Sequence, residues 1–190
     1  LMPPRALALG LDQVERWVAV NLTSLLAAGS LSIFNFARQL YVLPISLFGV
    51  SLSQATFPTL SKDALLADKT QYKETLTKSI LQIFFFSLPA SILILVLRVP
   101  LVRIAFGAKS FPWDATLETA KSLALLSLSI APLAVSHTLI RAHHAIKDTK
   151  TPLYSGFLSL LSYGLLSVLF TKVYGWGITG LCLALSLSNF

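Results

Sequence analysis

Long apolar runs, each about the length of a membrane crossing, constrain this chain more than any other feature. Hydrophobic residues make up 55% of its 190 residues and charged residues only 12%, with a mean hydropathy of +0.74. A water-soluble domain usually carries about 25% charged residues, so this chain cannot cover a water-facing surface. The apolar content also excludes intrinsic disorder. We therefore predict an all-α, polytopic transmembrane helix bundle.

Five full spans and a partial sixth are predicted, within a single transmembrane region over residues 1–190. The predicted helices cover residues 5–27, 32–60, 71–97, 114–141 and 152–170, and a last one begins near residue 177. The apolar stretch 100–106 is too short to cross a bilayer. The final run, 178–190, is also shorter than the roughly 20 residues of a span. We interpret the chain as a piece of a longer protein, truncated inside this helix.

Helix-breaking residues lie inside two of the predicted spans. Proline lacks the N–H that would bond four residues back, so Pro44 and Pro89 are expected to kink their helices. In lipid, such a kink persists only where a neighbouring helix or water satisfies the freed carbonyl. We predict hinges at Pro44, Gly49 and Pro89.

The basic residues divide unequally between the two predicted sides of the membrane. One side carries eight of them: Arg5, Lys62, Lys69, Lys73, Lys78, Arg141, Lys147 and Lys150. The opposite side carries four: Arg98, Arg103, Lys109 and Lys172. The excess places the first side in the cytoplasm, so the net charge of +7 indicates membrane topology rather than nucleic-acid binding. The loop lysines at 62–78 would meet anionic membrane lipids.

A cluster of charges lies in the first predicted span. Asp12 and Arg16 are four residues apart and can pair on one helix face, with Glu15 beside them. Charges inside a membrane normally face a partner or a wet cavity. In one interpretation, Glu15 and Arg16 line a cavity. In the other, the helix starts near Trp17 and the cluster lies among the lipid headgroups.

The second span carries Arg38 and Gln39, and no acid within that span can pair with Arg38. The planar guanidinium group suits phosphate oxygens. Arg38 and Gln39 are therefore candidates to bind an anionic headgroup in a central cavity. The alternative for Arg38 is that its side chain extends to the outer interface.

No catalytic constellation is found in the sequence. It contains no nucleophile elbow, phosphate-binding loop or paired-carboxylate pattern. Cys182 is the single cysteine, which excludes an internal disulfide and a cysteine metal cluster. We predict a non-enzymatic protein without a metal or cofactor.

Two stretches carry a family resemblance. The first is RQLYVLPISLFGV at 38–50 with FPTLS at 57–61, and the second is RAHHAIKDTKTP at 141–152. Both resemble the bacterial lipid II flippases of the MurJ/MviN type, of the multidrug/oligosaccharidyl-lipid/polysaccharide exporter superfamily. That family often has a cavity arginine where the match places Gln39. Here the arginine is one position earlier, rotated by about 100° on an ideal helix.

The resemblance implies a multi-pass protein of the bacterial plasma (inner) membrane, with two lobes around a cationic cavity. This chain would be helices seven to twelve, in the C-terminal lobe, with the N-terminal lobe as its partner. The implied activity moves lipid II, the undecaprenyl-pyrophosphate-linked peptidoglycan precursor, across the membrane by alternating access for cell wall synthesis. Two alternatives stay open: an exporter of another lipid-linked saccharide or small cation, and a non-transporting membrane scaffold.

Overall fold

All regular structure in the described residues is helical, as predicted. The computed structural model describes residues 2–26, 29–66, 68–107 and 111–189, with side chains of the first helix from residue 13 on. The α-helices are α1 Met2–Ser24, α2 Ser30–Pro44, α3 Ser51–Asp63, α4 Thr70–Val96, α5 Arg98–Phe106, α6 Trp113–Ser127, α7 Ile130–Ala145, α8 Lys150–Val168 and α9 Gly177–Ser188. Two π-helical segments, η1 Ile45–Val50 and η2 Leu169–Val173, join α2 to α3 and extend α8.

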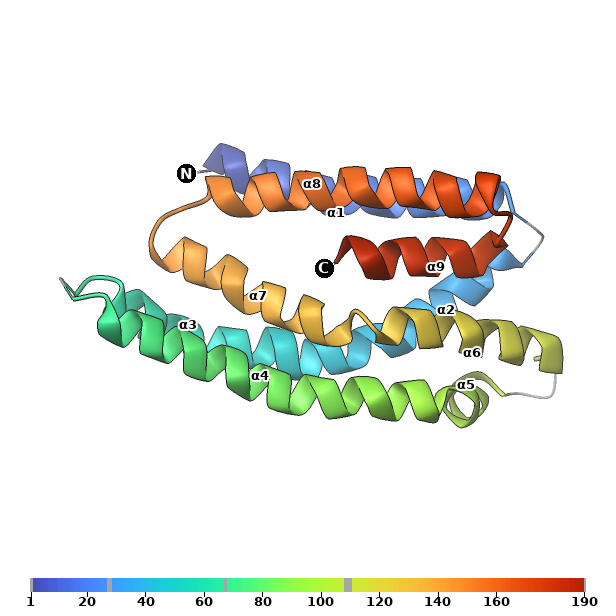
Figure 1. Ribbon diagram of the computed structural model, residues 1–190, viewed down its shortest axis with the longest axis horizontal. Helices are drawn as coiled ribbons and strands as arrows, with labels where there is room; N and C mark the ends of the chain where they lie inside the picture. Colours follow the sequence, from blue (N-terminus) through green and yellow to red (C-terminus); the bar gives the residue numbers. More distant parts are fainter. Residues whose placement is uncertain (1, 27–28, 67, 108–110, 190) are drawn as a thin grey trace.

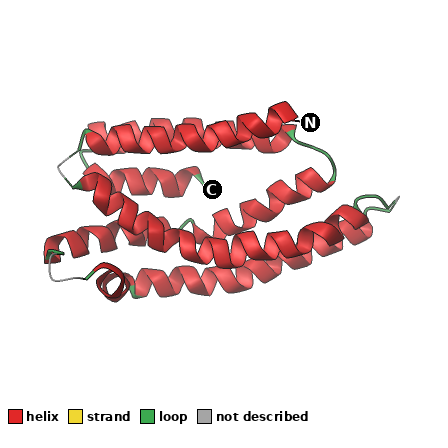
Figure 2. Ribbon diagram, turned by 180° about the vertical axis from the view of Figure 1, so that it is seen from behind, coloured by secondary structure: helices red, strands yellow, loops and turns green. Residues whose placement is uncertain are grey.

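The long helices run side by side, with their connections at the two ends of the bundle (Figures 1 and 2). One layer holds α1, α8 and α9, and the other holds α2, α3, α4 and α7 (Figure 1). The α6 helix packs on both α9 and α2 and so joins the layers. Between them lies a continuous core that includes Phe34, Tyr41, Leu123, Tyr163 and Leu181. The short α5 helix lies across the bundle end and appears end-on in Figure 1.

Three helices of the described chain are long and apolar enough to cross a membrane. They are the continuous helix Ser30–Asp63, α4, and the helix Lys150–Val173; the bent pair α6–α7 makes a fourth if counted as one span. The first predicted span is present as α1, with 23 residues, but its charges keep it outside this apolar set. The α9 helix is apolar and has 12 residues.

The second predicted span is one continuous helix whose geometry changes at Pro44. This proline ends α2, and the wider π-helical turn η1 follows it directly. Serines supply extra donors there: the Ser46 hydroxyl donates to the Leu43 carbonyl at 2.8 Å, and that of Ser51 to the Ser46 carbonyl at 3.0 Å. Polar side chains thus bond carbonyls around a proline in an apolar environment, as membrane helices require.

The fourth predicted span, expected as one helix over 114–141, is in fact two helices. The α6 and α7 helices meet at an angle of 46° across residues 128–129. The physical reason is Pro132, which lies in the first turn of α7 and has no N–H to donate to the carbonyl four residues earlier. From α4, the Ser91 hydroxyl donates to the Ser127 carbonyl at the end of α6. In contrast, α4 continues through Pro89 without a break.

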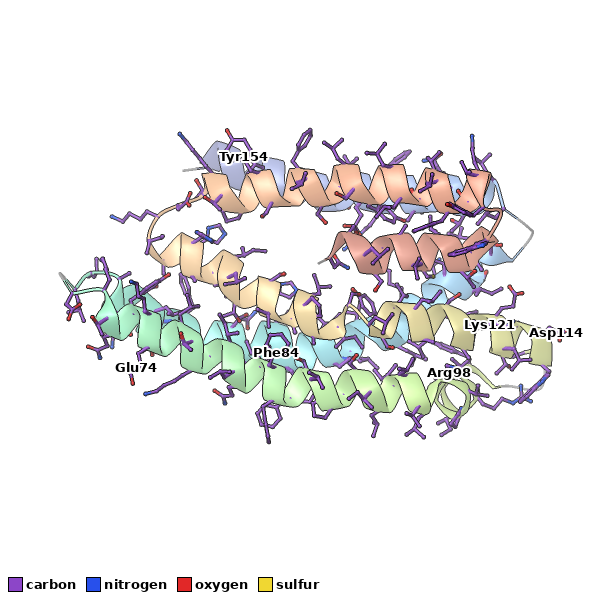
Figure 3. All side chains as sticks on the ribbon, in the orientation of Figure 1. Glu74, Phe84, Arg98, Asp114, Lys121 and Tyr154 are labelled. Carbon is purple, nitrogen blue, oxygen red and sulfur yellow. The ribbon has the colours of Figure 1, made fainter. Side chains whose placement is uncertain are left out.

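Charged side chains gather at the two ends of the bundle. Figure 3 places Glu74 at one end and Arg98, Asp114 and Lys121 at the other. The loops after α3 and α7 share the first end, and those after α1, α4 and α8 share the second (Figure 1). The eight basic residues assigned to the cytoplasm therefore belong to the segments at the first end. This agrees with the alternating direction of successive spans, on which the prediction of the cytoplasmic side was based.

The start of α8 is held by Asp148, within the DTKTP motif at 148–152. Its Oδ1 accepts hydrogen bonds from the backbone N–H groups of Lys150 and Thr151, at 3.0 and 3.2 Å. The hydrogen bonds from Thr151 hold the pKa of the Asp148 carboxyl below its ordinary value. Its Oδ2 lies 3.4 Å from Nδ1 of His143 at the end of α7. One carboxylate therefore satisfies donors at the first turn of α8, as an N-terminal cap does.

We predict that Asp148→Ala speeds amide hydrogen exchange at residues 150–151 of the full-length protein at pH 7. Because the folded-state pKa of Asp148 is lowered, its stabilisation is present above the unfolded pKa and fades as the pH falls through the folded value. The difference between wild type and variant should therefore shrink on acidification. Asp68→Ala, in the other loop at this end, is the control and should leave this exchange unchanged. Equal exchange in the Asp148 variant and wild type at pH 7 would contradict the capping role.

Gly49 allows the π-helical turn to touch α7. A Cβ atom at this position would lie 2.7 Å from the Ala134 Cα and 2.9 Å from its Cβ. Since the obstructing atoms are backbone and a short side chain, neither can move aside. The predicted hinge residue is thus a close-packing point between η1 and α7.

We predict that Gly49→Ala lowers the free energy of unfolding of the full-length protein by about 1–3 kcal/mol, the usual cost of overpacking. Gly164→Ala is the matched control, because a Cβ there would meet nothing within 4 Å. That control should leave stability unchanged or raise it by roughly 0.5–1 kcal/mol, as alanine favours helix more than glycine. Thermal unfolding in detergent measures both, and an equal effect of the two substitutions would exclude the close-packing argument.

Candidate functional site

Two of the predicted site residues, Glu15 on α1 and Arg38 on α2, form an ion pair in the structure. Nη2 of Arg38 lies 3.8 Å from Oε1 of Glu15. The two side chains keep 28% and 27% of their surface exposed, respectively. No acid on α2 pairs with Arg38, and the neighbouring helix α1 supplies one instead. Both charges are largely withdrawn from solvent, yet one side of the pair stays open.

Helical spacing directs this pair toward the core. Ala19 is one turn beyond Glu15 on the same face of α1, and Ala37 and Tyr41 flank Arg38 on α2. All three are at most 3% exposed and belong to the same hydrophobic cluster. The ion pair thus lies at the border of the core, near the middle of both helices.

Buried polar groups from other helices accompany the pair. The Tyr41 hydroxyl oxygen accepts hydrogen bonds from Ser129 Oγ, at the α6–α7 junction, and from Asn189 Nδ2, just beyond α9, both at 3.4 Å. Tyr163 on α8 is 1% exposed. Tyr41 and Tyr163 belong to the same core cluster as Ala19, which is one turn from Glu15. We call Glu15, Arg38, Tyr41 and Tyr163 the central polar cluster.

The other predicted site residues are not part of this cluster. The side chains of Arg16 and Gln39 are exposed on the described chain. The Asp12 side chain lies outside the described residues. Because α1 begins at Met2, a helix start near Trp17 is wrong. The choice between a cavity and the lipid headgroups for this charge cluster stays a prediction.

A separate cavity of about 320 Å³ lies at the end of the bundle opposite the basic loops. The turn between α1 and α2, the α6 helix and the turn before α9 form its walls. Glu118, Lys121 and Trp176 line it, and the Trp176 ring stacks on Phe170 with centroids 5.5 Å apart. None of the four predicted substrate-binding residues lines this cavity.

The central polar cluster combines features suited to an anion. The guanidinium group of Arg38 offers several donors in a fixed geometry. The Glu15 carboxylate lies 3.8 Å from it, which is too far for a strong hydrogen bond. The exposed part of Arg38 leaves a direction of approach. The arrangement can thus hold a carboxylate or a phosphate oxygen beside a partly desolvated cation.

Comparison with known proteins places the chain in a family. The model of the family described as "Lipid II flippase MurJ" matches residues 1–190. The chain belongs to this family. It is therefore a multi-pass protein of the bacterial inner membrane, and its fold is that of a MurJ-type transporter.

Curated relatives support the same assignment. A "Probable lipid II flippase MurJ" of Bdellovibrio bacteriovorus is 30% identical over 183 residues, covering 96% of this chain and 35% of the relative. The Thermotoga maritima protein of the same description is 29% identical over 184 residues, covering 96% of this chain and 37% of that protein. This chain thus spans little more than a third of the MurJ relatives it matches.

Solved structures share the fold. A structure described as "Lipid II flippase MurJ, inward closed conformation" superposes with a TM-score of 0.86 and 30% identity, covering 96% of this chain and 38% of that one. A MATE crystal structure superposes with a TM-score of 0.84 at 16% identity, which shows the fold alone. The helix arrangement is therefore shared more widely than the MurJ sequence.

Sequence reasoning missed the tyrosines of the cluster. Tyr41 and Tyr163 each lie in the middle of an apolar helix, where a hydroxyl usually needs a hydrogen-bond partner. The hydroxyl group in apolar surroundings is the feature of the sequence that could have identified these tyrosines. Which helix would supply the partner could not be known without the packing.

A double-mutant cycle on the full-length protein tests whether Glu15 and Arg38 interact energetically. Glu15→Gln and Arg38→Gln should each cost about 1–3 kcal/mol of unfolding free energy, because each removes one partner of a partly buried ion pair. The double variant should cost less than the sum, with a coupling of at least about 0.5 kcal/mol.

The exposed Glu74–Lys78 pair, at 2.6 Å, serves as the control and should show a smaller coupling because solvent screens it. Strictly additive costs for Glu15 and Arg38 would show that the pair contributes no interaction energy.

Proposed function

We propose that this chain is the C-terminal lobe, helices seven to twelve, of a flippase for lipid II. The single observation that carries the proposal is the match of the MurJ family model to residues 1–190. The relatives bear the name of lipid II flippase and are nearly three times as long, which leaves room for an N-terminal lobe. The activity belongs to the whole protein, with lipid II and the surrounding lipids as its partners.

The chemistry of the chain agrees with an anionic cargo. Lipid II carries a pyrophosphate, and Arg38 is a partly buried cation with an open side near the middle of α2. A cationic cargo would need unpaired acids at such a site, whereas Glu15 is engaged by Arg38. Gln39 and Arg16, exposed on the described chain, would face the cavity between the lobes.

The work of the protein would be conformational rather than catalytic. Flipping a lipid changes no covalent bond, so it requires a site that opens alternately to each leaflet. The π-helical turn after Pro44 contacts α7 at Gly49–Ala134, in the helix that follows the 46° break between α6 and α7. These irregular segments are the places where the lobe would bend, while α4 stays continuous through Pro89.

The proposal is tested with the full-length protein by measuring how much lipid II is accessible in the outer leaflet. Wild type should restore accessibility and growth in a flippase-depleted bacterium. Arg38→Ala should abolish both while membrane insertion stays intact. Lys172→Ala, which removes an exposed cation from η2, is the control and should behave like wild type. If wild type inserts correctly but transports no lipid II, the proposed function is wrong; normal growth of the Arg38 variant would remove that residue from the site.

A further inference from the structure

Tyr163 has a hydroxyl group whose hydrogen-bonding capacity is unused. The residue is 1% exposed, and its oxygen has no hydrogen-bond partner in the described chain. A buried hydroxyl without a partner costs free energy. Four other buried side-chain atoms of the described chain also lack a hydrogen-bond partner, in Ser87, Ser122, Thr138 and His143. An unsatisfied polar group in a native structure calls for an explanation, and an absent ligand is one.

The position of Tyr163 connects this hydroxyl to the ion pair. Tyr163 belongs to the same core cluster as Ala19, one turn from Glu15, and as Tyr41, one turn from Arg38. Its helix α8 lies along α1 in the same layer (Figure 1). Electrostatic interaction of Glu15 and Arg38 with the Tyr163 hydroxyl agrees with this placement.

The ion pair itself is poorly optimised. At 3.8 Å, the Arg38–Glu15 contact is about 1 Å longer than a strong charge-assisted hydrogen bond. A carboxylate also brings a single negative charge to a guanidinium group that can hold two phosphate oxygens in parallel. Glu15 therefore occupies the anion position beside Arg38 but does not saturate the hydrogen-bond donors of the guanidinium group.

We propose that Glu15 is an exchangeable counter-ion of Arg38, displaced when a diphosphate group binds, and that the Tyr163 hydroxyl donates a hydrogen bond in the exchanged state. The proposal rests on the proposed function and adds two residues, Glu15 and Tyr163, to its anion site. In the empty state Glu15 keeps Arg38 paired. In the loaded state the diphosphate takes the guanidinium group, and Tyr163 donates to the oxygen nearest it.

The exchange avoids the main cost of an arginine in an apolar bundle. An uncompensated buried charge is strongly destabilising, and Arg38 has a negative partner both before and after the exchange. The displaced Glu15 carboxylate, which is 27% exposed in the empty state, has to turn into solvent away from the diphosphate. The Tyr163 hydroxyl gains the acceptor that it lacks in the empty state. The empty site would therefore hold two imperfect interactions, which the diphosphate replaces with better ones.

The test measures binding of undecaprenyl pyrophosphate to the full-length protein in nanodiscs, with wild type and two conservative variants. Glu15→Gln should bind about 3–10-fold more tightly, because the competing charge is gone. Tyr163→Phe should bind about 3–10-fold more weakly, since only the donor is removed. Inorganic pyrophosphate is measured in parallel: competition by it assigns the site to the diphosphate alone, and lack of competition assigns it to the lipid-linked form.

Two matched controls separate this role from a structural one. Tyr154→Phe is on the same helix at a tyrosine that is 71% exposed and projects away from the bundle (Figure 3). Glu74→Gln removes an exposed acid. Neither should change binding. Tyr163→Phe should also keep or raise the thermal midpoint of the empty protein, because removing an unpaired buried hydroxyl is not destabilising.

The outcomes distinguish the inference from the function on which it rests. If wild type binds undecaprenyl pyrophosphate but both variants bind as wild type does, the exchange is wrong and the proposed function stands. Weaker binding by Glu15→Gln would also overturn the exchange, because it would make Glu15 a support of Arg38 rather than a competitor. If wild type moves no lipid II and binds no undecaprenyl pyrophosphate, the proposed function itself fails.

Discussion

An arginine inside an apolar helix bundle must be given a negative partner, and the Arg38–Glu15 pair meets this requirement between two helices. Much of the arrangement around it follows. The pair brings the middle of α2 close to the middle of α1, and α1 in turn lies along α8. Tyr41 and Tyr163 belong to the same core cluster as Ala19 and Ala37, the residues that flank the pair. A polar site thus forms where apolar packing and ion pairing coincide.

The second constraint is that backbone carbonyls at helix irregularities need donors within the protein. Next to Pro44, serines of the same helix donate to the Leu43 and Ser46 carbonyls, and before Pro132 a serine of α4 donates to the Ser127 carbonyl at the end of α6. The π-helical turn η1 also contacts α7 through Gly49, where a side chain would not fit. One link between this region and the central polar cluster is the hydrogen bond from Ser129, at the α6–α7 junction, to the Tyr41 hydroxyl.

Much of this fold could be predicted from the chain alone, because an apolar run of span length leaves few alternatives to a helix. The helix through Pro44 follows from length and composition, and so does the prediction that the apolar stretch 100–106 is too short to cross. The break between α6 and α7 does not, since a proline in a predicted helix interior can bend it, end it or, as in α4, leave it continuous. Which of these occurs depends on the neighbouring helix that supplies a donor.

The same division applies to the site. Arg38 and Glu15 stand out in the sequence as charges in apolar surroundings, and helical spacing directs each to one face. Their contact joins residues of different helices, so it could be known only from the packing. Arg16 and Gln39 carry the same chemical signal but lie on exposed faces of the described chain. The hydroxyl of Tyr163 in an apolar helix is visible in the sequence, but that it lacks a hydrogen-bond partner is known only from the packing.

The most direct measurement of the central claim is a structure of the full-length protein with lipid II bound. The account predicts that a pyrophosphate oxygen lies about 2.7–2.9 Å from the Arg38 guanidinium group, as in charge-assisted hydrogen bonds. A bound lipid II whose pyrophosphate lies far from Arg38, with the guanidinium group still on the Glu15 carboxylate, would contradict it.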